Sequence, residues 1–159
     1  MSENWLQQSV AEAIGTFALI FVGVLSISAA GIVGAPAGLA TLASIGLAHG
    51  LTIAVMVAAL GAISGGHFNP AVTCGFVVTG RMKPATGLMY WIAQLIGASA
   101  AGLLIAALFG GGPVAGGTPD LGRGVGTGAG IVVEAGATFF LVLVVFGTAV
   151  DERAPAAVF

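Results

Sequence analysis

The run Ser64-Gly65-Gly66-His67-Phe68-Asn69-Pro70-Ala71-Val72-Thr73 decides the fold. Its Asn-Pro pair is typical of a helix start, because asparagine caps a helix and proline fits the first helical position, where an N–H would have no partner. The run lies between hydrophobic segments long enough to cross a bilayer. Non-helical backbone at membrane depth is tolerated only where it is buried in protein or lines a watery cavity. The run therefore predicts a pore.

The composition is typical of an integral membrane protein. Of the 159 residues, 58% are hydrophobic and only 6% are charged, whereas soluble domains carry about a quarter charged residues. The formal net charge of −2 offers no basic surface for nucleic acid. Cys74 is the only cysteine, so no disulfide can form within the chain. We expect an all-α membrane protein that needs no cofactor and no metal.

Four stretches are long enough for the roughly 20 residues that span a hydrocarbon core: residues 8–31, 39–63, 85–109 and 129–150. A fifth apolar stretch, 70–80, would form a helix of only about 16 Å, or half of a 30 Å core. Arg81 and Lys83 follow at once, so this half-helix must return to the side from which it entered. The glycine-rich segment 110–128 is expected to be an exposed irregular loop.

Basic residues predict the orientation of the chain. With the N-terminus inside, Arg81, Lys83 and Arg153 all lie inside and only Arg123 lies outside. Short cytoplasmic loops carry an excess of lysine and arginine. We therefore predict a cytoplasmic N-terminus, in the plasma (inner) membrane.

An internal repeat underlies the spans. Residues 10–17 (VAEAIGTF) align with residues 132–139 (VVEAGATF), and the alignment matches Glu12 with Glu134. The repeat unit holds three spans and one half-helix, and an odd number of crossings inverts the second copy. We assign residues 1–159 to a single transmembrane channel domain, with the first repeat at 8–109 and the start of the second at 129–150. The chain would then be truncated after the fourth span, and we expect the natural protein to continue with two more spans and a second half-helix.

The run from Ser64 to Thr73 resembles the first signature loop of the aquaporin (major intrinsic protein) family. The glutamate-bearing first span, the Gly-Arg pair after the half-helix and residues 90–98 are also similar to that family. The resemblance implies an inverted-repeat bundle of six spans, two half-helices that meet at the midplane, a pore in every subunit and a homotetramer. The chain departs from the family pattern because it lacks the second signature loop and the arginine that follows it at the narrowest point.

Asn69, Pro70 and Ala71 are the first candidate pore residues. In the simpler interpretation, Asn69 only caps the half-helix. In the functional one, its side-chain amide also donates hydrogen bonds into the pore. The helix N-terminus carries about half a positive elementary charge, and half-helix ends of this kind exclude cations and protons in aquaporin-type pores.

The four residues before the cap are the next candidates: Gly65, Gly66, His67 and Phe68. In an extended entry loop their carbonyls would form a ladder of acceptors along the pore, and glycine permits the unusual dihedral angles that such a loop needs. For His67 two interpretations stay open. One is a protonatable gate at the inner mouth, and the other is a structural histidine bonded to neighbouring backbone.

His49 lies on the second span, on one helical face with positions 53, 56, 60 and 64. By the resemblance it falls at the first position of the aromatic constriction, where water-selective members commonly carry phenylalanine and glycerol facilitators tryptophan. A histidine there is similar to plant vacuolar members with mixed transport of water and small solutes. The alternative is a buried histidine bonded to a neighbouring helix, although ionisable residues in membrane spans are functional by default.

Glu12 and Glu134 occupy equivalent positions in the repeat. A lone buried carboxylate is costly in a membrane, so two equivalent copies indicate a shared structural role as braces that accept backbone N–H groups from the irregular loops. The resemblance supports this role, with Gln94 as a helper. A proton relay is the alternative.

The sequence thus predicts a passive channel for water and possible small neutral solutes such as glycerol, urea or ammonia, with protons and cations excluded at the Asn-Pro-Ala site. The alternatives are a non-conducting truncated fragment, a facilitator dedicated to such solutes, and an ion- or proton-coupled transporter. No hydrolase, metal or nucleotide motif is present in the sequence, so we expect no enzyme. Pairs of small residues four apart predict packing seams, both within the bundle and between subunits: Gly46 with Gly50, Gly61 with Gly65, and Ala98 with Gly102.

Overall fold

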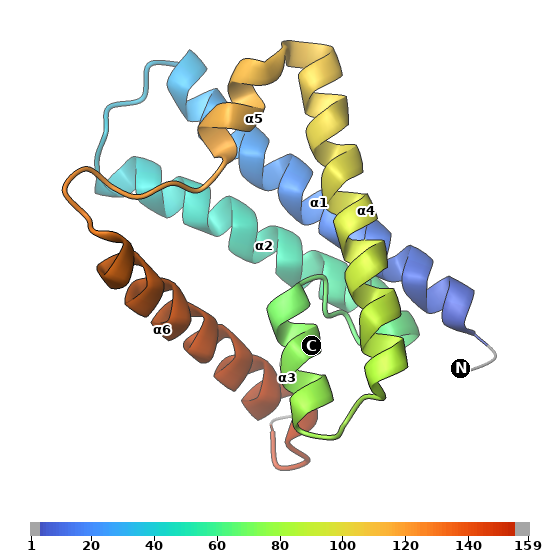
Figure 1. The fold of residues 1–159 in the computed structure, drawn as a ribbon. Coiled ribbons are helices and arrows are strands. Elements are labelled where there is room, and N and C mark those ends of the chain that lie inside the picture. Colours follow the sequence, from blue (N-terminus) through green and yellow to red (C-terminus); the bar gives the residue numbers. More distant parts are fainter. Residues whose placement is uncertain (1–3, 155–159) are drawn as a thin grey trace.

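The computed structural model describes residues 4–154, and that part of the chain is built from helices without strands. The elements, drawn in Figure 1, are α1 (Trp5–Ile32), α2 (Leu39–Ser64), α3 (Pro70–Val78), α4 (Pro84–Phe109), α5 (Gly111–Gly117), α6 (Thr127–Val145) and the π-helical turn η1 (Phe146–Val150). The expected continuation past Phe159 lies outside the described residues.

Four of these elements are long and apolar enough to cross a membrane: α1, α2, α4 and the stretch Thr127–Val150 formed by α6 and η1. Each begins and ends within about three residues of a predicted span, so the prediction of four spans is confirmed. The short helix predicted at 70–80 is α3, with 9 residues. At 1.5 Å per residue it is about 14 Å long, or half of a hydrocarbon core.

Local sequence explains both ends of α3. At the start, the side chain of Asn69 accepts a hydrogen bond from the N–H of Ala71, and Pro70 takes the first helical position. At the end, Gly80 adopts a left-handed conformation with φ +72°. The N–H of Gly80 donates to the carbonyl of Val77, and that of Arg81 donates to the carbonyl of Phe76, which is the Schellman pattern. Gly80 therefore stops the helix.

The prediction of an irregular loop over 110–128 is wrong in part, because residues Gly111–Gly117 form α5. Glycine disfavours helices by about 1 kcal/mol relative to alanine, so local propensity does not explain this helix. α5 contacts both α1 and α4. A Cβ added at Gly117 would lie 2.8 Å from both methyl groups of Val24. Packing against α1 thus overrides the local preference.

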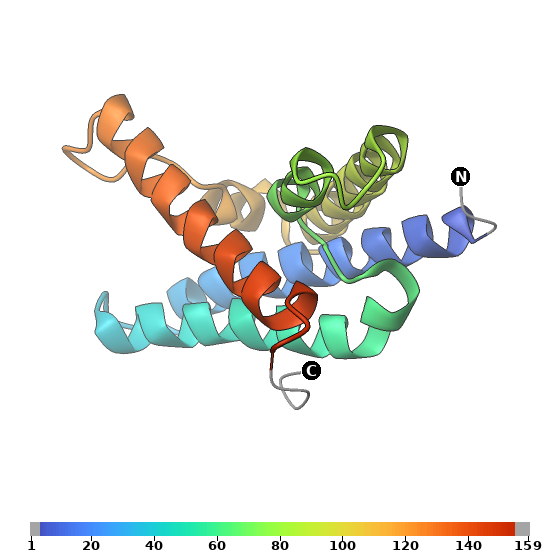
Figure 2. The same cartoon turned by 90° about the horizontal axis from the view of Figure 1, so that it is seen from below.

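α1 is the central helix of the bundle. Its backbone packs against α2 on one side and against α4 on the other, whereas the backbones of α2 and α4 do not pack against each other within the described residues. Figure 2 shows α1 lying between them, with α6 crossing in front. Among the described helices, α6 packs against α3, which in turn packs against α4. The half-helix is therefore the link between the fourth span and the other three.

Three basic residues gather at one end of the bundle. Arg81 and Lys83 line a cavity of about 540 Å³ with Gln8 and Ser64, near the start of α1 and the end of α2. Arg81 also lines a second cavity with Arg153, after η1. Figure 1 shows the start of α1, the turn between α3 and α4 and the end of η1 at the same end of the molecule. The three residues thus lie near one end of the bundle.

The close helix contacts occur at glycines other than the predicted ones. A Cβ at Gly97 of α4 would collide with the backbone carbonyl of Ala13 in α1, so the two helices meet backbone to backbone. Cβ atoms at Gly46, Gly50 and Gly102 would meet nothing within 4 Å. Within the described part of this single chain these positions form no seam, because the spacing of small residues does not say which face meets a neighbour. The prediction that they make contacts between subunits stays a prediction.

Replacement of Gly97 by alanine should destabilise the bundle, because the added methyl group forces α1 and α4 apart. Overpacking of this kind costs about 1–3 kcal/mol. Gly102→Ala, in the same helix but in open space, is the matched control and should be neutral or slightly stabilising. Thermal unfolding in detergent should give a lower Tm for Gly97→Ala alone. Equal Tm values for the two variants would contradict the proposed contact.

Candidate functional site

The loop between α2 and α3 has an unusual backbone. Gly65 and Gly66 take φ values of +89° and +66°, and Phe68 takes +47°. Phe68 is the one non-glycine residue with positive φ among residues 4–154, and such conformations persist only where the surroundings enforce them. Asn69 then returns to an extended conformation, with φ −151°. The loop therefore needs support from outside itself.

Glu12 of α1 provides that support. Its Oε1 accepts hydrogen bonds from the hydroxyl of Ser64 at 2.7 Å and from the N–H of His67 at 3.0 Å. Its Oε2 accepts from the N–H of Phe68 at 2.7 Å and from the side-chain amide of Gln94 at 2.8 Å. The side chain is 0% exposed. Four donors from three elements therefore converge on one carboxylate.

An ionised carboxylate is an acceptor with about four lone-pair sites, and here all four sites are used. Bonds to charged groups are roughly twice as strong as neutral ones. A buried charge is tolerated when hydrogen bonds replace its hydration. The arrangement thus gives Glu12 a full set of partners and gives the loop N–H groups an acceptor that water cannot supply at this depth.

A chain of side chains extends from Glu12 toward the histidine of the loop. The amide nitrogen of Gln94 donates both to Glu12 and, at 3.0 Å, to the hydroxyl of Thr73 in α3. That hydroxyl lies 3.0 Å from Nδ1 of His67. The ring of His67 is 3% exposed and packs against Phe76. His67 is therefore buried and bonded to a side chain, not to neighbouring backbone.

Phe68 is held on both sides of its backbone. Its N–H donates to Glu12, and its carbonyl accepts from the hydroxyl of Thr16 at 3.2 Å. Its ring is buried against Gly15, where an added Cβ would lie 2.5 Å from the ring carbon Cγ. Glu12, Gly15 and Thr16 lie on one face of α1. This face of α1 enforces the left-handed conformation of Phe68.

Two aromatic side chains of α4 complete the site. The hydroxyl of Tyr90 donates to the carbonyl of Ser64 at 2.7 Å, and the indole N–H of Trp91 donates to the carbonyl of Pro70 at 3.0 Å. Sequence reasoning gave no role to Thr16, Tyr90 or Trp91. A signal existed for Thr16, because the internal repeat matches it with Thr138 four positions after the second glutamate.

Several polar groups near the cap have no partner in residues 4–154. Oδ1 of Asn69 accepts a hydrogen bond from the N–H of Ala71. The side-chain amide nitrogen of Asn69 makes no hydrogen bond within the described residues. The carbonyls of Gly65, Gly66 and His67 accept no hydrogen bond in that part either. The carbonyl of Phe68 differs from the predicted ladder because it is bonded to Thr16.

His49 lies away from this loop, half-buried on α2. Its Nδ1 is 2.8 Å from the carbonyl of Ile45 in its own helix, so its bond is not to a neighbouring helix. A Cβ at Gly23 of α1 would collide with Nε2 of His49. The ring thus sits at the seam between α1 and α2.

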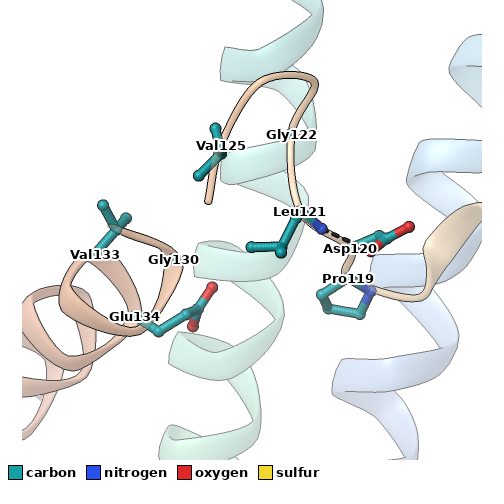
Figure 3. A pocket seen from close by; sticks show the side chains of 8 residues that line it. All are labelled: Pro119, Asp120, Leu121, Gly122, Val125, Gly130, Val133 and Glu134. Carbon is teal, nitrogen blue, oxygen red and sulfur yellow. Dashed lines mark hydrogen bonds between the residues drawn. The ribbon is translucent and has the colours of Figure 1, made fainter. Parts of the chain in front are cut away.

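Glu134 is exposed and has no hydrogen bond within the described residues. It lines a cavity of about 510 Å³ beside the loop after α5. Figure 3 shows its carboxylate directed toward Leu121, while Asp120 bonds the N–H of Leu121 and points away. Glu134 and Val142 also line an apolar cavity of about 720 Å³ between α3 and α6. The structure thus brings Glu12, Gln94 and the loop together and leaves Glu134 apart.

The role of Glu12 can be measured by the conservative change Glu12→Gln. Its new NH₂ group would face other donors, and each buried donor left unpaired costs about 1–3 kcal/mol. We expect a loss of about 2–4 kcal/mol and a lower Tm in detergent. Glu152→Gln changes an exposed side chain that makes no hydrogen bond within the described residues; it is the control and should keep the parent Tm. An unchanged Tm for Glu12→Gln would mean that the network contributes little.

Comparison with known proteins agrees with this geometry. The family model "Major intrinsic protein" matches residues 1–157. Aquaporin TIP2-1 of Arabidopsis thaliana is 41% identical over 150 residues, covering 93% of this chain and 59% of the relative. Aquaporin TIP4-4 of Zea mays is 44% identical over 149 residues, covering 91% and 58%. The probable aquaporin AqpM of Archaeoglobus fulgidus is 38% identical over 174 residues, covering 98% and 70%.

The chain spans about three-fifths of the length of the two plant relatives. Four apolar helices of membrane-spanning length and these relatives make it a multi-pass integral membrane protein. The loop that joins α2 to α3, the half-helix that it caps and the family match over residues 1–157 agree with one another. The chain belongs to the major intrinsic protein family.

Proposed function

We propose that this chain forms part of a passive membrane channel for water and small neutral solutes. The observation that carries the proposal is the amide of Asn69, which caps a helix of half-membrane length and keeps its two N–H donors unpaired within residues 4–154. Such donors would bind the oxygen of a passing water molecule. The names of the relatives, all aquaporins, support the same function.

Cation exclusion follows from the same helix end. The N-terminus of α3 carries about half a positive elementary charge, and at membrane depth little water is present to screen it. Neither Asp nor Glu lies in α3 or in the loop before it. The nearby carboxylate of Glu12 already accepts four hydrogen bonds and has no site left for a cation. A cation or a hydrated proton at Asn69 would therefore be repelled by the positive helix end, whereas a neutral solute would not.

The free carbonyls of Gly65, Gly66 and His67 supply acceptors before the cap. Water that passes them would exchange its bulk hydrogen bonds for these carbonyls one at a time, which supports single-file passage. We assign Pro70 and Ala71 to the cap itself, since one sets the first turn and the other satisfies Oδ1 of Asn69.

We assign Glu12 to a brace and not to a proton relay. Its four acceptor sites face four donors, so a proton on the carboxylate would displace one of them. Gln94 helps by linking the brace to α3 through Thr73. By the internal repeat, Glu134 would serve a second irregular loop in the same way. The bond of His67 to Thr73 and the burial of its ring favour a structural role over a gate.

For the whole protein we propose a homotetramer with a cytoplasmic N-terminus in the plasma (inner) membrane. The gathering of Arg81, Lys83 and Arg153 at one end supports the orientation under the positive-inside rule. The family resemblance supports the tetramer. Every pore would then lie within one subunit, so transport would not require a partner's side chains.

The experiment is stopped-flow shrinkage of liposomes that contain the full-length gene product, with a pH-sensitive dye inside. Water flux without a proton leak is expected. Asn69→Asp keeps an acceptor for the N–H of Ala71 but adds a negative charge that offsets the helix end, so it should introduce a proton or cation leak. Asn4→Asp adds the same charge at the exposed cap of α1, about two helical turns before Glu12, and should not.

Three results would separate the candidate functions. Absence of water flux above empty liposomes would favour the non-conducting alternative. A proton current in the parent protein would favour the coupled transporter. If neither the parent nor the Asn69→Asp variant leaks protons or cations, the positive end of the half-helix is not what excludes cations.

We propose that His49 forms part of the constriction that discriminates among solutes. One hydrogen bond between a ring nitrogen and a solute contributes about 1 kcal/mol to the binding of that solute. His49→Phe should therefore lower urea or ammonia flux about fivefold more than it lowers water flux. Parallel flux measurements in the same liposomes test this. Equal effects on all solutes would argue against a selectivity role.

A further inference from the structure

We propose that Gly23 of α1 is a positioning residue for His49, and that the missing side chain at position 23 helps to set which solutes pass. This inference rests on the proposed role of His49 in the constriction. The new element is that the position of the His49 ring depends on Gly23, a residue of another helix that does not itself contact the solute.

The first support is the bond between His49 and its own helix. Nδ1 lies 2.8 Å from the carbonyl oxygen of Ile45, one turn earlier. A carbonyl oxygen only accepts, so Nδ1 must carry the hydrogen. In the neutral ring Nε2 is then the acceptor, and it has no hydrogen-bond partner within residues 4–154. The bond to Ile45 therefore fixes the tautomer and places the lone pair of the ring on Nε2, the nitrogen turned toward α1.

The second support is the space in which the ring lies. Gly23 is buried, and a Cβ built on it would collide with Nε2 of His49 and would lie 2.9 Å from Cδ2 and 3.0 Å from Cε1. These three atoms form one edge of the imidazole, so the edge fills the volume where a side chain at position 23 would begin. Because Gly23 lies within α1, which packs against α2 and α4, the backbone has little freedom to withdraw.

The two contacts together fix the ring. The Ile45 carbonyl holds one nitrogen, and the notch at Gly23 receives the other edge. A methyl group at position 23 would push the ring away from α1 and draw Nδ1 off the Ile45 carbonyl. The displaced ring would move out of the seam between α1 and α2 and over Ile53 and Met56, which share its face of α2 and are partly buried. The proposed constriction beside His49 would become narrower, and the hydrogen of the His49 ring would no longer be fixed on Nδ1.

The test uses Gly23→Ala in the full-length protein in liposomes, with Gly31→Ala as the matched control. Gly31 lies in the same helix, and a Cβ there meets nothing within 4 Å. We expect Gly23→Ala to lower the ratio of urea flux to water flux at least fivefold and Gly31→Ala to leave it unchanged. Nitrogen-15 NMR of labelled histidine should show the Nδ1-protonated ring in the parent and in Gly31→Ala, and a changed Nδ1 signal in Gly23→Ala.

A double-mutant cycle with His49→Ala completes the test. Without the ring there is nothing to displace, so Gly23→Ala should have no further effect on the flux ratio in that background. If Gly23→Ala folds poorly, His49→Ala should restore its Tm for the same reason. Additive effects of the two substitutions, or an unchanged NMR signal in Gly23→Ala, would overturn the proposal. Loss of all solute flux in the parent would refute the proposed function, while the NMR and Tm comparisons would still decide the role of Gly23.

Discussion

The four hydrogen bonds to the carboxylate of Glu12 are the constraint on which the site depends. The loop before α3 has to present N–H groups and positive φ angles where no bulk water is available. One buried acceptor satisfies two of those N–H groups and also ties α4 to the loop through Gln94. The hydrogen bonds from the loop replace the hydration that the buried carboxylate loses, and the carboxylate in turn satisfies loop N–H groups that would otherwise be unpaired.

The packing of α1 explains how one residue can reach three elements. At Gly97 the backbones of α1 and α4 approach so closely that a Cβ would collide with the Ala13 carbonyl, and this brings Gln94 within reach of Glu12. Gly15 makes room for the ring of Phe68 one turn further along α1. The contacts of α1 with α2 and α4 then fix the loop between them. Close helix packing and the conformation of the loop between α2 and α3 are therefore parts of the same arrangement.

Much of the fold was predictable from sequence, because hydrophobic length decides membrane spans and capping chemistry decides the ends of α3. The pairing of Glu12 with the loop backbone was predictable from the cost of a buried carboxylate. The packing glycines were not, since Gly46, Gly50 and Gly102 follow the same spacing rule as interface glycines but lie in open space. α5 was missed because its helical form depends on contact with α1. The contact of His49 with Gly23 was not predictable either, because it joins two helices and no spacing along the sequence indicates it.

The order of residues along the chain has a consequence for biogenesis. Glu12 enters the bilayer with α1, but its partners Ser64, His67 and Phe68 emerge from the ribosome about fifty residues later. In the interval the unpaired carboxyl group lies about two turns into α1, where its cost is below the roughly 2.5–3.5 kcal/mol that insertion scales give for a charged side chain at a helix centre. The remaining apolar length of α1 offsets that cost. The nascent first helix is thus held by its hydrophobic residues alone until the chain that follows supplies the donors.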